Sequence, residues 1–530
     1  MFFATGAQPA EALPDSTVAY LSVDLDPSGQ QKLEALSTLR QFPAFVENVD
    51  LRAEDDLRLR LFEQLQGDGL CPEVDFEDDI DPWLGNRFAT AAIKLGGAGE
   101  GTAGLDVTAV GVVQLDDAER AEDGLAALRA CGGDSEAFGW SIVGDWAVLA
   151  ETEQVARDVT DAAADAPLSA DDDFERWTGE AGDPGILTGY AAPAFGGLFA
   201  DIAGDLGGLG GFASPPIDCL APRGDDLDPF AEDPFAEDPF GSDPFGSDPF
   251  ADECSGEFVP PAGDGMNDMF AAFADFEGAA MTMRFSDGGL EVEVASGVGK
   301  MSSDSLTSDA GADVVSTLPE DTAVALGIGL PEGWSEDFRE GFDDVLGEGG
   351  LDGFLSLAEA ETGLDLPQDL ETLLGTSTAV ALGGDADLAD LDAPEPPADF
   401  PLGLKVQGDT EAISEVFDDV LRSLGDPTLD SLLGYDVDGD FMVAGPSADY
   451  RAELLGDGGL GDTDVFEEHV LGADEAAAVF FVNFDAGSWL TSIPGLPDDV
   501  RRNLAPLNAL GFSGWTDDDV SHVALRLSTD

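Results

Sequence analysis

The side chains with the clearest capacity for chemistry in this sequence are four cysteines: Cys71, Cys131, Cys219 and Cys254. Four cysteines can pair in three ways, and an even number suits disulfide formation. Disulfides persist in oxidising compartments, so the count favours a protein that works outside the cytoplasm. A zinc site is not expected, because no Cys-x-x-Cys spacing occurs and both histidines lie far along the chain from every cysteine.

Residues that could support catalysis form no recognisable motif. The sequence contains no Gly-x-Ser-x-Gly elbow, no His-Glu-x-x-His and no Walker-type Gly-Lys-Ser/Thr. A histidine-based triad is not expected from two histidines, and His522 lies in a strand-like stretch typical of a packed histidine. Residues 436–440 lack the ligand order of a calcium loop. Paired carboxylates could lie anywhere among 111 acidic residues, so they indicate nothing about glycoside hydrolysis. We therefore expect no catalytic residues, no cofactor and no metal.

Several acidic residues have positions that predict a structural role. Asp116 and Asp409 each follow a predicted strand and precede a predicted helix, so both are expected to be helix N-caps, with Glu119 completing a capping box. Asp145 and Asp440 belong to predicted hairpin turns. These residue types are explained by the fold.

The predicted strands and helices that position these residues occur twice in the sequence, as an internal repeat. LPDSTVAYLSVDL, residues 13–25, aligns without a gap with LPEDTAVALGIGL, residues 318–330. The block at 74–86 recurs at 364–376, and the predicted strand and helix at 107–130 recur from residue 400. The hairpin at 138–150 recurs at 433–445, and the hairpin at 281–295 has a looser counterpart at 512–527. A period above 200 residues indicates duplicated domains and is too long for a solenoid repeat.

The predicted fold class is α+β, a tandem duplication of a mostly antiparallel sheet with helices packed on one face. Several strand pairs are joined too tightly for crossover connections, which favours antiparallel pairing. We divide the chain into a membrane-proximal segment at 1–14, a first unit at 15–300, a linker at 301–317 and a second unit at 318–530.

The first unit carries an insertion at about 204–262 that the second unit lacks. Asp-Pro-Phe occurs there five times at five-residue spacing between residues 228 and 252. Regular proline removes backbone donors from helices and strands, so we predict a low-complexity, disordered loop. Such tripeptides also serve as docking motifs in eukaryotic endocytic proteins, but nothing else in the sequence points to that setting. A repeat-expanded spacer is therefore favoured over a docking tether.

Comparison of the two units predicts the disulfide pairing. Cys71 and Cys131 match Glu361 and Leu424 in the second unit, which lacks both cysteines, as expected of a bonded pair. Cys219 and Cys254 bracket the Asp-Pro-Phe repeats, and closing a loop of that length stabilises a fold by roughly 3 to 4 kcal/mol. We predict disulfides Cys71–Cys131 and Cys219–Cys254.

Net charge excludes some partners. With 21 basic and 111 acidic residues, the chain carries a formal charge of −90, which repels nucleic acid and anionic lipid headgroups. Carboxylates stay coupled over a Debye length of about 8 Å at physiological ionic strength. We expect the melting temperature to rise between low and molar salt. A melting temperature that stays flat or falls would contradict this prediction.

A membrane span is not expected within the sequence. Residues 186–203 come closest to the roughly 18 to 20 apolar residues required, but Pro193 and Asp201 interrupt them. The first 14 residues have no basic flank, and they are interpreted as neither a signal peptide nor an anchor.

The segment at 13–45, preceded by Gly-Ala-Gln-Pro-Ala at 6–10, resembles the start of the actinobacterial family catalogued as domain of unknown function 3352. VDFEDDIDPWLGNR, residues 74–87, is a second block similar to that family. The resemblance implies a single transmembrane helix immediately before residues 6–10, with the body outside the membrane. This sequence lacks that helix. The resemblance implies no catalytic residues.

These observations lead to an expected function in two forms. The first is a non-catalytic, extracytoplasmic envelope protein, the soluble body of a single-pass membrane protein, with an envelope protein as possible partner. The second is an envelope hydrolase, or a protein that binds small apolar ligands, with an unrecognised site. The sequence leaves the oligomeric state open.

Overall fold

A computed structural model gives the arrangement of the chain. It describes residues 7–25, 29–48, 56–67, 71, 74–95, 107–131, 138–198, 276–286, 288–298, 308–331, 333–336, 339, 355–356, 358–360, 362–389, 397–424, 433–456, 458–517 and 519–530. The predicted insertion at 204–262, with Cys219 and Cys254, lies outside the described residues.

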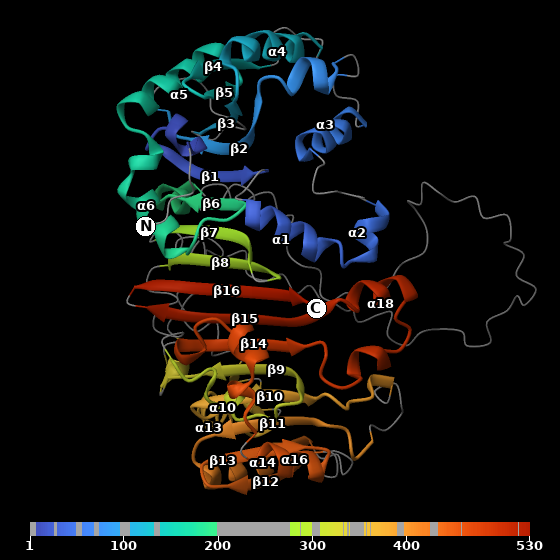
Figure 1. Ribbon diagram of the computed structural model, residues 1–530. Coiled ribbons are helices and arrows are strands. Elements are labelled where there is room, and N and C mark those ends of the chain that lie inside the picture. Colours follow the sequence, from blue (N-terminus) through green and yellow to red (C-terminus); the bar gives the residue numbers. More distant parts are fainter. Residues whose placement is uncertain are drawn as a thin grey trace, which may run out of the picture.

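The described strands form a single antiparallel sheet of 16 strands. The first half contributes β1 Thr17–Asp24, β2 Leu84–Ile93, β3 Thr108–Leu115, β4 Gly139–Val143, β5 Trp146–Ala150, β6 Leu187–Ala191, β7 Phe276–Ser286 and β8 Gly289–Val298. The second half contributes β9 Thr322–Gly329, β10 Ser377–Gly383, β11 Leu402–Gln407, β12 Gly434–Asp438, β13 Phe441–Gly445, β14 Ala476–Asn483, β15 Leu507–Asp517 and β16 Val520–Thr529. Figure 1 shows the strands stacked from β4 at one end to β12 at the other.

The two halves have the same strand order. The first runs β4-β5-β3-β2-β1-β6-β7-β8, the second runs β12-β13-β11-β10-β9-β14-β15-β16, and β8 pairs with β16 in the middle. Matched contacts recur as well: Asp79 accepts a hydrogen bond from the Asp75 amide at 2.9 Å, as Asp369 does from Asp365 at 2.7 Å. This identity of order is what a duplication predicts, and duplication stays our interpretation of it.

Helices connect the strands of each half. The α-helices are α1 Gly29–Leu39, α2 Pro43–Asn48, α3 Leu57–Gly67, α4 Ala118–Cys131, α5 Glu153–Asp165, α6 Asp172–Glu180, α10 Asp313–Ser316, α13 Gln368–Leu374, α14 Thr410–Leu424, α16 Ala448–Leu454, α17 Asp464–His469 and α18 Asp498–Leu504, as far as the structure describes them. Short helical turns lie at η1 Pro9–Ala12, η2 Phe76–Ile80, η4 Leu168–Ala170, η9 Leu460–Asp462, η10 Ala473–Glu475 and η11 Trp489–Ser492.

The fold class is α+β, as predicted, but helices cover both faces of the sheet. Successive residues of a strand point to opposite faces. On β5, Val148 packs in the cluster that contains Ala156 of α5, whereas its neighbour Ala147 packs in the cluster that contains Leu125 of α4. The expectation of helices on one face was therefore wrong in that detail. A strand with apolar residues on both faces, such as β5, indicates that both faces of the sheet are covered.

The segments expected to flank the units belong to their cores. Ala12 in η1 is 1% exposed and packs in the core of the first half, although it falls in the segment assigned to the membrane-proximal region. Val314 and Val315 of α10 are fully buried in the second half, although they fall in the expected linker. Each half thus begins with a helical turn placed before the Leu-Pro of its first block.

One of the two expected helix caps is displaced by one residue. The Asp409 carboxylate accepts hydrogen bonds from the Glu411 and Ala412 amides, so it caps α14 as predicted. In the first half, Asp117 rather than Asp116 accepts the equivalent bonds, from Glu119 and Arg120. α4 begins one residue later than its counterpart, and two adjacent aspartates made the position ambiguous in the sequence.

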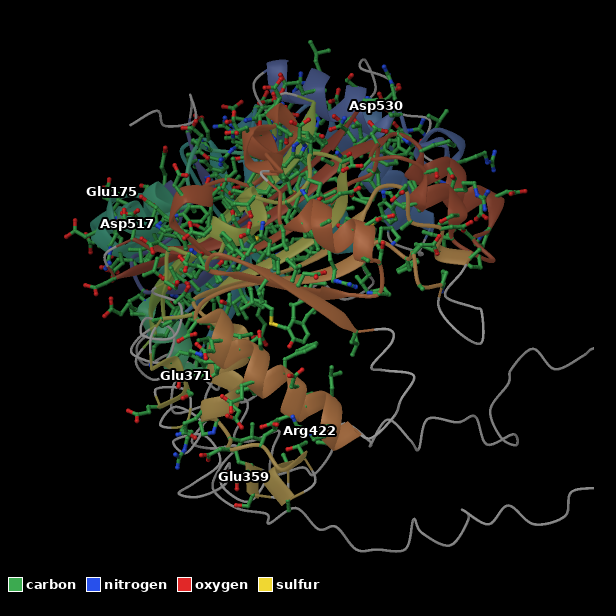
Figure 2. The ribbon with its side chains drawn as sticks, turned by 90° about the horizontal axis from the view of Figure 1, so that it is seen from below. Glu175, Glu359, Glu371, Arg422, Asp517 and Asp530 are labelled. Carbon is green, nitrogen blue, oxygen red and sulfur yellow. A yellow bond between two sulfur atoms is a disulfide. The ribbon has the colours of Figure 1, made fainter. Side chains whose placement is uncertain are left out.

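Charged side chains line the outside of the molecule. Figure 2, which looks along the stack of strands, shows Glu175 of α6 and Asp517 of β15 at its outer edge, and both are exposed. It also shows Arg422 far along α14, where the guanidinium pairs with Asp419. Pairs between exposed side chains of this kind contribute at most about 1 kcal/mol each.

Candidate functional site

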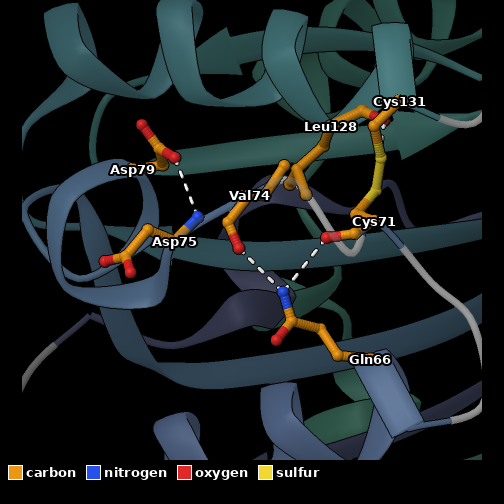
Figure 3. The surroundings of a disulfide bond; sticks show 7 residues. All are labelled: Gln66, Cys71, Val74, Asp75, Asp79, Leu128 and Cys131. Atoms are coloured by element: carbon orange, nitrogen blue, oxygen red, sulfur yellow. Dashed lines mark hydrogen bonds between the residues drawn. A yellow bond between two sulfur atoms is a disulfide. The ribbon is translucent and has the colours of Figure 1, made fainter.

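The predicted pair Cys71 and Cys131 comes together as a disulfide, with Cα atoms 5.4 Å apart (Figure 3). The bond ties the segment after α3 to the last residue of α4. Gln66 supports this corner, because its side-chain amide donates to the carbonyls of Cys71 at 3.0 Å and Val74 at 2.7 Å. Oxidising conditions favour such a bond.

A group of partly or fully buried polar side chains lies where the halves meet. We call it the junction cluster, and its members are Arg284, Glu291, Glu293, His469, Arg526 and Ser528. Arg284 of β7, Glu291 of β8 and Arg526 of β16 are direct cross-strand partners. Their side chains are 13%, 8% and 13% exposed, so the charges are largely removed from water.

Two arginines share one carboxylate at this junction. Arg284 pairs with Glu291 and also contacts Glu293 at 2.7 Å, while Arg526 lies 3.7 Å from the second Glu291 oxygen. The Ser286 hydroxyl donates to that same oxygen at 3.2 Å. Nε of Arg526 is buried with no hydrogen-bond partner among the described residues. Glu291 therefore neutralises charge contributed by both halves.

His469 and Ser528 form the closest approach to a catalytic geometry. His469 Nε2 lies 2.6 Å from the Ser528 hydroxyl oxygen, and Nδ1 lies 2.6 Å from the Val465 carbonyl. Because a carbonyl only accepts, Nδ1 carries the proton and Nε2 is free to accept from the serine. Histidine and serine are 3% and 8% exposed, which leaves almost no surface for a substrate.

Sequence reasoning missed the junction cluster because it forms between residues that are far apart in the sequence, some of them in different units. His469 and Ser528 are 59 residues apart, and Arg284 and Arg526 come from separate halves. One signal was available: Glu291 and Glu293 alternate with apolar residues in a strand whose other positions are small or apolar. Charges on that alternating face indicate pairing with a neighbouring strand.

The environment of His469 predicts a pH dependence of stability. Burial lowers its pKa below the ordinary 6.5, and the positive charge of Arg526 adds to this, while the hydrogen bond to Val465 opposes it. A base with a lowered pKa in the folded state is protonated preferentially in the unfolded chain. Its contribution to stability is therefore complete above about pH 6.5 and is lost as the pH falls through that value toward the folded pKa.

We expect His469→Gln to flatten the fall in the free energy of unfolding between about pH 7.5 and 5.5, measured by urea denaturation. Glutamine keeps a polar group opposite Ser528. The parent chain, measured over the same pH range, is the control. An unchanged slope in His469→Gln would contradict the assignment.

The acidic cap and turn residues singled out in the sequence lie away from the junction cluster. Asp409 and Asp440 line an open depression of about 490 Å³ beside Thr376 and Thr410.

Among the described residues, no three histidine, cysteine or acidic side chains are grouped so that they could hold a metal ion. In the same part of the chain, no helix is long and apolar enough to cross a membrane. His522 is packed, as expected, with its ring stacked 5.1 Å from that of Trp515.

Comparisons of the chain with protein-family models, curated proteins and solved structures found no match.

Proposed function

We propose that this chain is the extracytoplasmic, non-catalytic body of a membrane-anchored envelope protein. Three observations support the placement: the Cys71–Cys131 disulfide, the acidic surface, and the resemblance of residues 6–45 and 74–87 to an anchored family. In this proposal the two halves act as one rigid platform, because a continuous sheet joins them. An envelope protein partner would use the outer surface of that platform.

One observation carries the non-catalytic part of the proposal. The residues with catalytic potential in the junction cluster contact one another in the interior. His469 is 3% exposed and held on both ring nitrogens, and Glu291 is 6% exposed and shared between Arg284 and Arg526. Such a cluster stabilises the contact between the halves and offers no group to a substrate.

Placement is tested by fractionating cells of the native host and locating the protein with an antibody against residues 318–530. The expected signal is in the membrane fraction, and it should be accessible to protease added outside intact cells. A signal confined to the cytosol would refute the extracytoplasmic placement.

A second candidate function, an envelope hydrolase, is favoured by the 2.6 Å contact between His469 and Ser528. Opening of α17 would be needed to expose the serine. A fluorophosphonate probe distinguishes the two candidates. The non-catalytic proposal expects no labelling above that of Ser528→Ala, together with no turnover of ester, glycoside or phosphate substrates. Labelling that Ser528→Ala abolishes would establish the hydrolase instead.

A further inference from the structure

A pocket of about 340 Å³ lies in the first half, at the ends of β1, β2 and β6. Its lining includes Asp15, Lys94, Asp171, Asp173, Tyr190 and Pro193. The lysine is one of only four in the chain, and among the described residues it forms no ion pair. The pocket therefore brings a cation and three carboxylates together in one depression that apolar residues also line.

The second half provides an internal comparison for these residues. Lys94 and Gly384 occupy equivalent positions in the two halves. The Lys94 amide donates to the carbonyl of Ser16, and the Gly384 amide donates to the carbonyl of Asp321, which each precede the matched threonine. The same alignment matches Asp173 with Val465. Both halves fold with the same strand order, so the fold itself requires neither the lysine nor this aspartate.

Tyr190 differs from its equivalent in the second half only by its hydroxyl group. Its ring packs edge-on against Phe174 at 5.0 Å, and the matched ring of Phe481 packs against Phe466 at 5.3 Å. The aromatic contact is conserved between the halves, and only the hydroxyl is additional. Burial raises the pKa of Tyr190, and the charges of Asp171 and Asp173 raise it further, so the phenol stays protonated and can donate a hydrogen bond.

The charges restrict what this pocket can bind. Three carboxylates repel a simple anion, and Lys94 opposes a simple cation. A molecule that carries both charges satisfies both sets of groups, with its ammonium toward the aspartates and its carboxylate toward Lys94. Val18, Ala192 and Pro193 supply apolar surface for the remainder of the ligand.

We propose that this pocket binds a small zwitterion, an α-amino acid with an apolar side chain. The first half is then the ligand-binding half, and the second half keeps the fold without the site. This inference is independent of the envelope placement, since it concerns recognition by the folded chain.

The test is isothermal titration of the full chain with L-alanine, L-valine, L-leucine and L-phenylalanine. At least one should bind saturably with one site per chain. The analogues of leucine that lack one charge, 3-methylbutylamine and 4-methylpentanoate, should bind at least about tenfold more weakly, since each loses a charge-assisted hydrogen bond.

Two variants introduce the residue of the second half, Asp173→Val and Tyr190→Phe, and Lys94→Met removes the charge while keeping an unbranched side chain. Lys94→Met and Asp173→Val should each weaken binding by about tenfold or more, and Tyr190→Phe by a smaller factor. Asp172→Val changes the neighbouring aspartate, which does not line the pocket, and should leave affinity unchanged. Thermal melting checks that each variant folds. The proposal fails if none of the four amino acids binds, or if Lys94→Met binds as tightly as the parent chain.

Discussion

Replacing Glu291 by alanine is expected to lower the free energy of unfolding by about 3 to 5 kcal/mol, the usual cost of leaving buried charges without their partner. The change would leave Arg526 with no other ion-pair partner among the described residues and would leave Arg284 with Glu293 alone. Because β8 and β16 join the two halves, the loss falls on the strand pair that holds them together. Urea denaturation of the purified chain gives the measurement.

Glu277→Ala is the matched control. Glu277 pairs with Arg176 at 3.9 Å, but both side chains are about half exposed, so its removal should change stability by less than about 1 kcal/mol. Removing the arginine left unpaired gives a second check: adding Arg526→Met to Glu291→Ala should recover part of the loss, while Arg284 keeps its contact with Glu293. Equal effects of Glu291→Ala and Glu277→Ala would show that burial of the pair is not what matters.

The double substitution Cys71→Ser with Cys131→Ser is expected to cost about 4 kcal/mol, the chain-entropy value for a loop of this size. The two cysteines are 60 residues apart in sequence. The loss should appear in urea denaturation, and amide exchange should accelerate in α3, which the bond connects to α4.

Reductant supplies the internal control for this bond. Dithiothreitol should lower the stability of the parent chain to that of the double variant and leave the double variant unaffected. Peptide mapping under non-reducing conditions should recover residues 71 and 131 in one linked pair. Two free thiols at these positions in the purified protein would contradict the assignment.

Much of the fold could be predicted from the sequence, because local signals agree with the final structure. The alternating apolar residues of 13–25 predicted a strand that recurs at 318–330, and both are central strands of their halves. The Cys71–Cys131 pair followed from comparing the halves, and the structure contains it. The Cys219–Cys254 pair stays a prediction.

Contacts between the halves could not be predicted, since nothing local specifies them. The pairing of β8 with β16 depends on two strands more than 200 residues apart, and each reads simply as one arm of a hairpin. The pocket around Lys94 could not be predicted either, because nothing in the sequence near Lys94 indicates that Asp171 and Tyr190 lie beside it. The alternation of apolar residues in a sequence indicates that a segment is a strand, but it does not specify which other strands pair with it.

The pairing of β8 with β16 also has a symmetry. The hairpin pairs Ser286 with Gly289 and Asp517 with Val520 align the strands so that Leu290 matches Ser521 and Ser296 matches Leu527. Leu290 pairs with Leu527, and Ser296 pairs with Ser521, so matched residues contact each other reciprocally. This is the geometry of an isologous, two-fold interface. A chain containing one half alone would expose this edge and is expected to close it with a second copy of itself, giving a homodimer in which β8 pairs with β8.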